Sequence, residues 1–188
     1  MKANITVRSI RMELNGRIKE SLSLAPFEFN ELVNESWNNS QLLNYLEETR
    51  FLFAAYKSFG GYYKFAGCSF WNMPTKLLDE AVKNGWEEIR QSIMAGIKFT
   101  KEPRKNGRFV YENTLPKKSN NSVIHIRPHA KQAAYRFADG TEIGNVERDA
   151  SELPDGQWMT KQSFWLNNEF IVSQLPFLED KCASENDA

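Results

Sequence analysis

The chain has 188 residues, of which 41% are hydrophobic and 13% aromatic, so general disorder is excluded and one domain with a substantial core is expected. Its formal net charge is zero, no apolar run approaches the roughly 18 residues of a membrane span, and no charged-then-apolar leader opens the chain. Cys68 and Cys182 lie far apart, so we expect no disulfide framework and a cytoplasmic location.

The first part of the chain is predicted to hold two strand hairpins separated by a partly helical segment. Asn-Gly and Gly-Gly pairs indicate both turns, because they favour tight connections between antiparallel strands. The elements are a strand from Ile5, a turn at Asn15-Gly16, a return through residues 18–24, a short helix ending in a loop within residues 27–45, a strand at residues 50–56, a turn at Gly60-Gly61 and a strand at residues 62–70.

The clearest helix signal is an apolar stripe that follows these strands. Its members recur at spacings of three or four residues, which places them on one face of an α-helix. We interpret the stripe as core packing and not as a cofactor-binding motif, with Thr75 as N-cap and Gly96 as the stop. The stripe consists of Leu78, Val82, Trp86, Ile89 and Ile93.

The second part of the chain predicts further short elements. The mixture of strands and helices, without an internal repeat, indicates one α+β domain over residues 1–177. In chain order we expect a polar, basic loop at residues 100–121 with one short strand at residues 109–111, a central strand at residues 122–126, a hairpin turn at Asp139-Gly140, a turn at Pro154-Asp155-Gly156, a helix from Ser163 to Leu175 capped near Thr160, and a disordered acidic tail at residues 178–188.

Charge is distributed unevenly along the chain. Residues 98–131 contain nine lysines and arginines against two glutamates, whereas residues 138–188 contain eleven acidic residues against three basic ones. Such a block predicts an anion-binding face, with Lys117 and Lys118 among its candidate phosphate contacts. A solvated surface loop is the alternative.

Two histidines lie within this block at a spacing of four. His125 and His129 have the spacing of a helical metal pair, but Pro128 lies between them and no cysteine or carboxylate stands nearby at ligand spacing. We therefore expect no metal site and interpret His125 as a packed strand residue.

Arg127 is the strongest candidate for a binding residue. It ends an apolar strand, and the ring of Pro128 restricts the backbone beside it, so little entropy is lost when the guanidinium is presented. This geometry suits guanine O6 and N7 in a major groove, while His129 and Lys131 would reach bases or phosphates. A structural salt bridge between Arg127 and a nearby carboxylate is the alternative.

A series of short motifs in this chain resembles the MutH family, and more closely the GATC-cutting type II restriction endonucleases of the Sau type. The resemblance runs from about residue 5 to residue 170, and the order of the motifs makes it specific. They are LEETRFLF (46–53), FWNMP (70–74), WEEI (86–89), IHIRPHA (124–130), LPDG (153–156) and TKQSFWLN (160–167).

The resemblance implies a MutH-like, restriction-endonuclease-like fold, in which a mixed β-sheet flanked by α-helices grips DNA in a cleft. It also implies that Arg127 and Pro128 read GATC in the major groove, with His129 beside them. The aromatic residue of the first motif packs near the DNA in this family, and here it is Phe51.

The segment after Gly156 holds a side chain near the methylatable adenine in this family. The corresponding residue here is Trp158 or Met159, and the tyrosine of the family is absent. Lys161 matches a basic position of the same segment and is a candidate phosphate contact.

The family's metal machinery is altered in this chain. The nucleases hold Mg²⁺ with an upstream Asp and a Glu-x-Lys, but in the corresponding stretch Thr6 stands in place of the Glu and Arg8 in place of the Lys. A neutral hydroxyl is a poor Mg²⁺ ligand, and a permanently protonated guanidinium cannot share in proton transfer. The upstream Asp is expected before Met1, together with the N-terminal part of the fold.

These features predict a DNA-binding effector domain of a restriction endonuclease, which binds double-stranded GATC DNA without cutting it. Its expected partner is the catalytic domain of the same enzyme, which would use Mg²⁺, whereas this domain would use no cofactor. The alternatives are an active Mg²⁺-dependent GATC endonuclease and a protein-interaction domain that has kept the fold without DNA binding.

Overall fold

The computed structural model describes residues 4–104, 107 and 109–175, so the predicted acidic tail at residues 178–188 lies outside the described residues. No helix within these ranges is long and apolar enough to cross a membrane. The described part of the chain contains twelve strands, six α-helices, two 3₁₀ turns (η1, η3) and one π turn (η2), which confirms the α+β class. In chain order they are β1 (Ile5–Met12), β2 (Leu22–Phe27), α1 (Phe29–Asn34), η1 (Trp37–Asn39), α2 (Gln41–Glu48), β3 (Arg50–Phe59), β4 (Tyr62–Trp71), α3 (Thr75–Leu77), η2 (Leu78–Val82), α4 (Lys83–Met94), β5 (Phe99–Pro103), β6 (Phe109–Asn113), η3 (Lys118–Asn120), β7 (Ile124–Pro128), β8 (Tyr135–Arg136), β9 (Glu142–Ile143), α5 (Val146–Asp149), β10 (Ala150–Glu152), β11 (Trp158–Thr160), β12 (Gln162–Leu166) and α6 (Asn168–Ser173).

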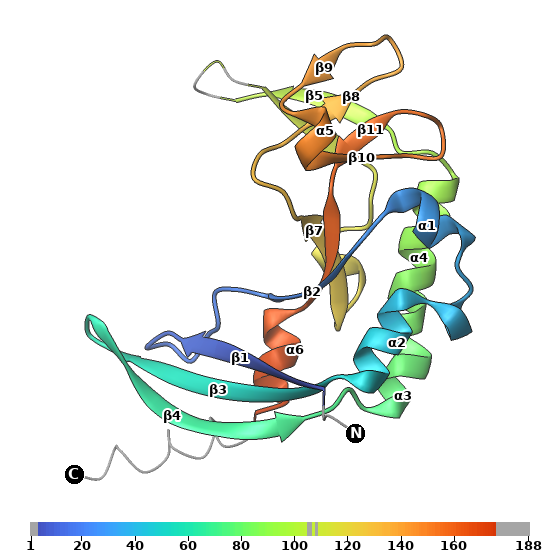
Figure 1. Cartoon of the computed structure of the whole chain (residues 1–188). Coiled ribbons are helices and arrows are strands. Elements are labelled where there is room, and N and C mark those ends of the chain that lie inside the picture. The colour runs from blue at the N-terminus through green and yellow to red at the C-terminus, as the bar shows by residue number, and fades with distance from the viewer. Residues whose placement is uncertain (1–3, 105–106, 108, 176–188) are drawn as a thin grey trace, which may run out of the picture.

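The strands form several small sheets that lie at different levels of the molecule (Figure 1). The sheet β1-β3-β4 lies at one end, and the sheet β10-β11-β8-β9 lies with the β5-β6 hairpin at the other. Between them the sheet β2-β12-β7 forms the middle level, and helices α1 to α4 run along one side.

The first sheet is mixed, since β1 runs parallel to β3 while β4 runs antiparallel to β3. The predicted turn at Gly60-Gly61 joins β3 to β4, and both glycines have a positive φ. The predicted hairpin at Asn15-Gly16 is only partly right. The turn forms, but the returning chain makes a single bridge, Met12 to Ile18, before β2 leaves to pair with β12. Leu24 and Phe27 of β2 are buried, and this packing outweighs the local hairpin preference.

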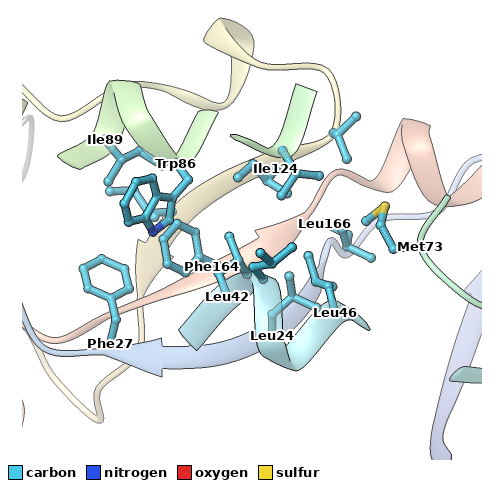
Figure 2. Packing of buried hydrophobic residues seen from close by; sticks show 14 of the residues in the cluster. Leu24, Phe27, Leu42, Leu46, Met73, Trp86, Ile89, Ile124, Phe164 and Leu166 are labelled. Carbon is cyan, nitrogen blue, oxygen red and sulfur yellow. The ribbon is translucent and has the colours of Figure 1, made fainter. Parts of the chain in front are cut away.

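The long helical segment confirms the predicted stripe, because all five of its members are buried. The segment runs without interruption through α3, η2 and α4, and Gly96 follows it with a φ of 88°. Pro74 and not Thr75 is its N-cap, and Thr75 is already the first helical residue. The stripe packs toward Phe164 and Ile124 of the middle sheet (Figure 2).

Gly85 of α4 lets β7 approach the helix closely. A Cβ at this position would lie 2.7 Å from the Asn121 side chain and 2.9 Å from Ile124. The Asn121 amide also donates to the Ala81 carbonyl across a distance of 2.7 Å. The start of β7 is therefore held against the helix, which sets the position of the strand's far end.

Two predictions for the second half of the chain were wrong in part. Ser163 to Leu166 belongs to strand β12, and the helix α6 begins only at Asn168, with Asn167 as its N-cap. β12 lies between β2 and β7, so β7, which was expected as a central strand, is an edge strand of its sheet. The short, largely apolar run from Ser163 to Leu166 was compatible with either a helix or a strand. Its pairing with β2 on one edge and β7 on the other makes it a strand.

The predicted basic loop contains more regular structure than expected. Its residues form the antiparallel β5-β6 hairpin, with Phe99 opposite Asn113, and only β6 was anticipated. The turn at Asp139-Gly140 joins β8 to β9 as predicted, and the turn at residues 154–156 joins β10 to β11.

Candidate nucleic-acid interface

Arg127 lies at the exposed end of β7. The preceding residues Ile124 to Ile126 are buried, whereas Arg127 and Pro128 are exposed. The backbone of Arg127 is paired with Ser163 of β12, so its position is fixed by the antiparallel ladder. Its guanidinium lies over the Trp165 ring, with 5.2 Å between Cζ and the ring centroid.

The alternative interpretation of Arg127 as a structural salt bridge is not supported within the described residues. None of their carboxylates lies within ion-pair distance of this guanidinium. The Trp165 face supports the guanidinium without using its N–H groups, which stay available to a ligand.

The structure brings His129 and Lys161 together with Arg127. The His129 N–H donates to the Lys161 carbonyl across a distance of 2.7 Å, which continues the β7-β12 ladder by one further bond. His129 is exposed and Lys161 is half-buried. Two residues from distant motifs therefore flank the same strand end, as expected for one contact surface.

Asp149 anchors the segment that carries Lys131, and the sequence analysis did not identify it. Its carboxylate accepts from the Lys131 N–H at 3.3 Å, and its carbonyl accepts from the Lys161 N–H at 2.9 Å. Asp149 is only 2% exposed, and Arg148 pairs with it at 2.6 Å. The hydrogen bond from Arg148 lowers the pKa of Asp149, and backbone N–H donors including that of Lys131 add to this effect. A buried Asp beside a loop carries no distinct sequence signal, so only the fold reveals this role.

A cavity of about 470 Å³ lies beside the end of β7 and gathers several of the predicted cations. Lys117, Lys118 and Arg127 line it, and Lys19 joins them from the loop after β1. Lys118 pairs with Glu169 at 2.6 Å, and it also donates to Asn168. The hydrogen bond from Lys118 lowers the pKa of Glu169, so this carboxylate competes with any external anion for the lysine.

His125 lines the same cavity from the buried part of β7. It is 4% exposed, and its Nδ1 is hydrogen-bonded to the Asn167 side-chain oxygen. The Asn167 amide group donates to the Asn121 carbonyl at 2.7 Å, so its oxygen faces the imidazole and accepts from Nδ1–H. Burial lowers the pKa of His125, with nearby Arg127 and Lys118 acting in the same direction. His125 is thus a packed strand residue, and no group of three potential metal-ligating side chains occurs in the described parts of the chain.

Two of the predicted contact residues are core residues, which corrects their assignment. Phe51 is 0% exposed and stacks on Phe53, so its ring has no surface for DNA. Met159 is 1% exposed and belongs to the same core. Trp158 is half-exposed and carries Arg136 over its ring at 5.3 Å. Of the two candidates after Gly156, Trp158 is therefore the one that reaches the surface.

Thr6 and Arg8 project from the same face of β1, because side chains two residues apart in a strand share a face. Arg8 lines a cavity of about 740 Å³ between β1 and β2, and its Nη2 donates to the Ser23 carbonyl at 3.2 Å. A hydroxyl and a guanidinium are unsuited to Mg²⁺, which prefers carboxylate oxygens. The residues at these two positions therefore do not fit the metal of the resembling nucleases.

The two cavities adjoin each other. Lys19 and Ser21 line both of them, and Trp165, which supports Arg127, lines the cavity of Arg8. A continuous surface thus connects Arg8 on β1 to the exposed end of β7. Trp165 and Lys19 were not anticipated as members of this surface. Trp165 lies within the motif TKQSFWLN (160–167), but the direction of its side chain is fixed only because β12 is a strand paired with β7.

Comparison with known proteins identifies a relative among the type II restriction enzymes. No protein-family model matches the chain. The chain is 32% identical to the type II restriction enzyme Sau3AI of Staphylococcus aureus over 188 aligned positions, which include 93% of this chain. The chain spans 38% of the length of that relative. It is thus related in sequence to part of a type II restriction enzyme.

Proposed function

We propose that this relative of a type II restriction enzyme is a domain that binds double-stranded DNA at GATC sites and does not cut it unaided. It would act as an effector domain beside the catalytic domain of the same enzyme, and the Mg²⁺ of the reaction would belong to that catalytic domain. The single observation that carries the proposal is the exposed guanidinium of Arg127, which is held by the β7-β12 ladder and by Trp165 without a carboxylate partner among the described residues.

The geometry of Arg127 supports a role in reading bases. Guanidinium groups recognise guanine through two parallel hydrogen bonds to O6 and N7, and this requires a fixed orientation of the planar group. The ladder fixes the backbone, Pro128 restricts the next residue, and the indole face supports the side chain. The GATC sequence itself comes from the resemblance of IHIRPHA to the family's reading segment.

The cations around this strand end support a role in holding the DNA backbone. Lys117, Lys118, Lys131 and Lys161 would neutralise phosphates, and His129 would reach a base or a phosphate. Such contacts add affinity that is independent of sequence and falls with salt, because bound counterions are released.

The residues at the altered metal positions support the absence of unaided cleavage. Hydrolysis with Mg²⁺ needs carboxylates for the cation and a group that can share in proton transfer. Thr6 and Arg8 provide neither, and Arg8 instead adds a permanent positive charge.

Binding of a duplex with one GATC site and of a matched duplex with the site scrambled tests the proposal directly. We expect the chain to prefer GATC without any divalent metal, and Arg127→Ala to lose this preference while keeping salt-dependent binding to both duplexes. Arg17→Ala is the matched control, since this arginine is exposed and lines neither cavity. An unchanged preference in Arg127→Ala would reject the assignment of this residue.

Experiments with the same purified chain distinguish the proposed function from two other candidate functions. Specific cleavage of a GATC plasmid by the purified chain with Mg²⁺ would show an active endonuclease, which the relative's description as a restriction enzyme favours. Binding that responds neither to salt nor to sequence would instead support a protein-interaction domain.

A further inference from the structure

The cavity beside β1 is lined by three cations and by the carboxylates of Glu13 and Glu20, and one of the cations, Arg8, has no carboxylate partner among the described residues. Three cations line this cavity of about 740 Å³: Arg8, Arg11 and Lys19. Arg11 pairs with Glu20 at 3.6 Å and Lys19 pairs with Glu13 at 3.2 Å. Arg8 forms no ion pair with any carboxylate of residues 4–104, 107 and 109–175.

The Arg8 side chain is held in place but is not saturated with hydrogen-bond partners. Nη2 donates to the Ser23 carbonyl at 3.2 Å, which ties the guanidinium to the end of β2. Nε is buried and has no partner among the described residues. A half-buried guanidinium with an unused donor and no counter-ion is unfavourable by itself, because its charge is partly shielded from water and its Nε–H has lost contact with water without gaining an acceptor.

Trp165 lines the same cavity and carries a second unused donor. Its indole Nε1 is buried and has no partner within the described part of the chain. An indole N–H can only donate, as can every N–H of a guanidinium, so both unsatisfied groups require an acceptor. A ligand that offers several oxygen acceptors and a negative charge meets both requirements.

We propose that this cavity is a phosphate-binding site in which the Arg8 guanidinium pairs with a backbone phosphodiester of the bound DNA and the Trp165 indole donates to the same group. The proposal rests on the proposed function, since the phosphate is taken to come from the DNA that Arg127 reads. Arginine suits this task, because its planar group presents two parallel donors to phosphate and keeps its charge at any physiological pH.

The position of Trp165 connects this site with the reading residue. The indole ring supports the Arg127 guanidinium at 5.2 Å from its centroid, while the same residue lines the cavity of Arg8. One side chain therefore contributes to both the base contact and the phosphate contact. The residue that replaces the lysine of the nucleases thus serves to hold the DNA in register and not to cut it.

Inorganic phosphate alone tests the site without DNA. We expect phosphate to raise the midpoint of thermal unfolding of the wild-type chain, and Arg8→Met to lose most of this increase. Trp165→Phe should weaken it, because phenylalanine keeps an aromatic ring but has no N–H. Arg17→Met is the matched control for the loss of one positive charge. An equal effect of phosphate on Arg8→Met, Arg17→Met and wild type would mean an adventitious ion only and would overturn the proposal.

A second experiment, which measures DNA binding, identifies the phosphate that Arg8 contacts. It also tests the phosphate site independently of the proposed function. Replacing single phosphates of the GATC duplex by neutral methylphosphonates should weaken binding of the wild-type chain at one or two phosphate positions. At those same positions the replacement should not change the DNA affinity of Arg8→Met. The salt slope of Arg8→Met should be shallower by about 0.9 with the preference for GATC retained, and Arg8→Lys should restore the slope.

If Arg8→Met and Arg17→Met respond identically in both the phosphate and the DNA experiment while the wild type prefers GATC, the phosphate site is wrong and the proposed function stands. If wild type ignores GATC but Arg8 alone mediates the phosphate effect, the function is wrong and the anion site stands.

Discussion

The Cζ atom of Arg127 lies 5.2 Å from the centroid of the Trp165 ring, and this contact joins the exposed end of β7 to β12. The two residues are diagonal neighbours in the antiparallel ladder, since Arg127 is opposite Ser163 and Trp165 is opposite His125. Diagonal pairs in a sheet lie within reach of long and aromatic side chains. The register of β12 against β7 therefore decides that the guanidinium has a rigid support.

Loss of the indole face should weaken discrimination between DNA sequences. An exposed cation–π contact contributes about 0.5–1 kcal/mol, so Trp165→Leu should reduce the preference for GATC over a scrambled duplex by about two- to fivefold. Trp165→Phe keeps an aromatic face and should retain most of the preference. Fluorescence anisotropy titrations of both duplexes measure the ratio, and equal loss in the two variants would contradict a role of the ring face.

Replacement of the Arg127 guanidinium, which we propose reads a guanine, by an ammonium should relax sequence specificity without removing charge. Arg127→Lys loses the two parallel donors but keeps the cation, so the preference for GATC should fall by about 1–3 kcal/mol, or about 5- to 150-fold. Binding to a scrambled duplex should change little, and the salt slope should be the same as in the wild type. A mobility-shift titration at several salt concentrations separates the two quantities, and a lower salt slope with intact preference would be the contrary result.

Release of Lys118 from its carboxylate partner should strengthen binding to any DNA. Glu169→Gln removes the ion pair of 2.6 Å that occupies this lysine. One additional phosphate contact should steepen the dependence of the logarithm of affinity on that of salt by about 0.9. Glu80→Gln, at an exposed position of η2 without an ion pair among the described residues, controls for the change in net charge. Equal affinities of the two variants would show that Lys118 does not contact the backbone.

Phe51 should matter for folding and not for DNA contact. Its ring is fully buried against Phe53 and Trp71, so Phe51→Ala should lower the free energy of unfolding by about 3–5 kcal/mol. Phe51→Leu should cost clearly less, and its folded protein should bind GATC as the wild type does. Urea unfolding followed by binding at equal folded concentration checks both statements. Loss of binding in a fully folded Phe51→Leu would reinstate the contact.

Stability should decrease as the pH falls below neutrality because of His125. Burial lowers the pKa of this residue in the folded chain below its ordinary value of 6.5, so the unfolded chain binds the proton more readily. The contribution of the neutral imidazole is complete above pH 6.5 and declines as the pH falls from there toward the lower folded pKa. His125→Asn should be less stable at neutral pH but should lack this decline. Urea unfolding between pH 7.5 and 5 gives the comparison, and parallel curves for the two proteins would contradict it.

Local patterns predicted the elements whose formation depends on neighbouring residues. The stripe from Leu78 to Ile93 has a helical period, and every member is buried, because a period of 3.6 leaves one face for the core. The turn at Gly60-Gly61 formed as expected, since glycine adopts a positive φ without steric cost. The exposure of Arg127 after a buried strand was likewise visible as a change of residue type within β7.

Predictions failed where pairing with distant residues decided the outcome. Ser163 to Leu166 could form a helix or a strand, and contact with both β2 and β7 made it a strand. The Asn15-Gly16 turn formed, but the returning chain makes only the Met12–Ile18 bridge to β1, and β2 pairs with the distant strand β12. Burial of Phe51 and Met159 depends on the same long-range packing, which no local pattern specifies.

The sequence by itself determined the α+β class, the strand that ends in Arg127 and the presence of a hydroxyl at Thr6 and a guanidinium at Arg8, because these are properties of residue type and short-range spacing. Only the tertiary structure decided that Trp165 supports Arg127, that Asp149 anchors the loop of Lys131 and that Arg8 faces a cavity without a carboxylate partner among the described residues. The physical reason is that such contacts join residues far apart in the chain, and they arise only when the sheets have paired and the core has closed.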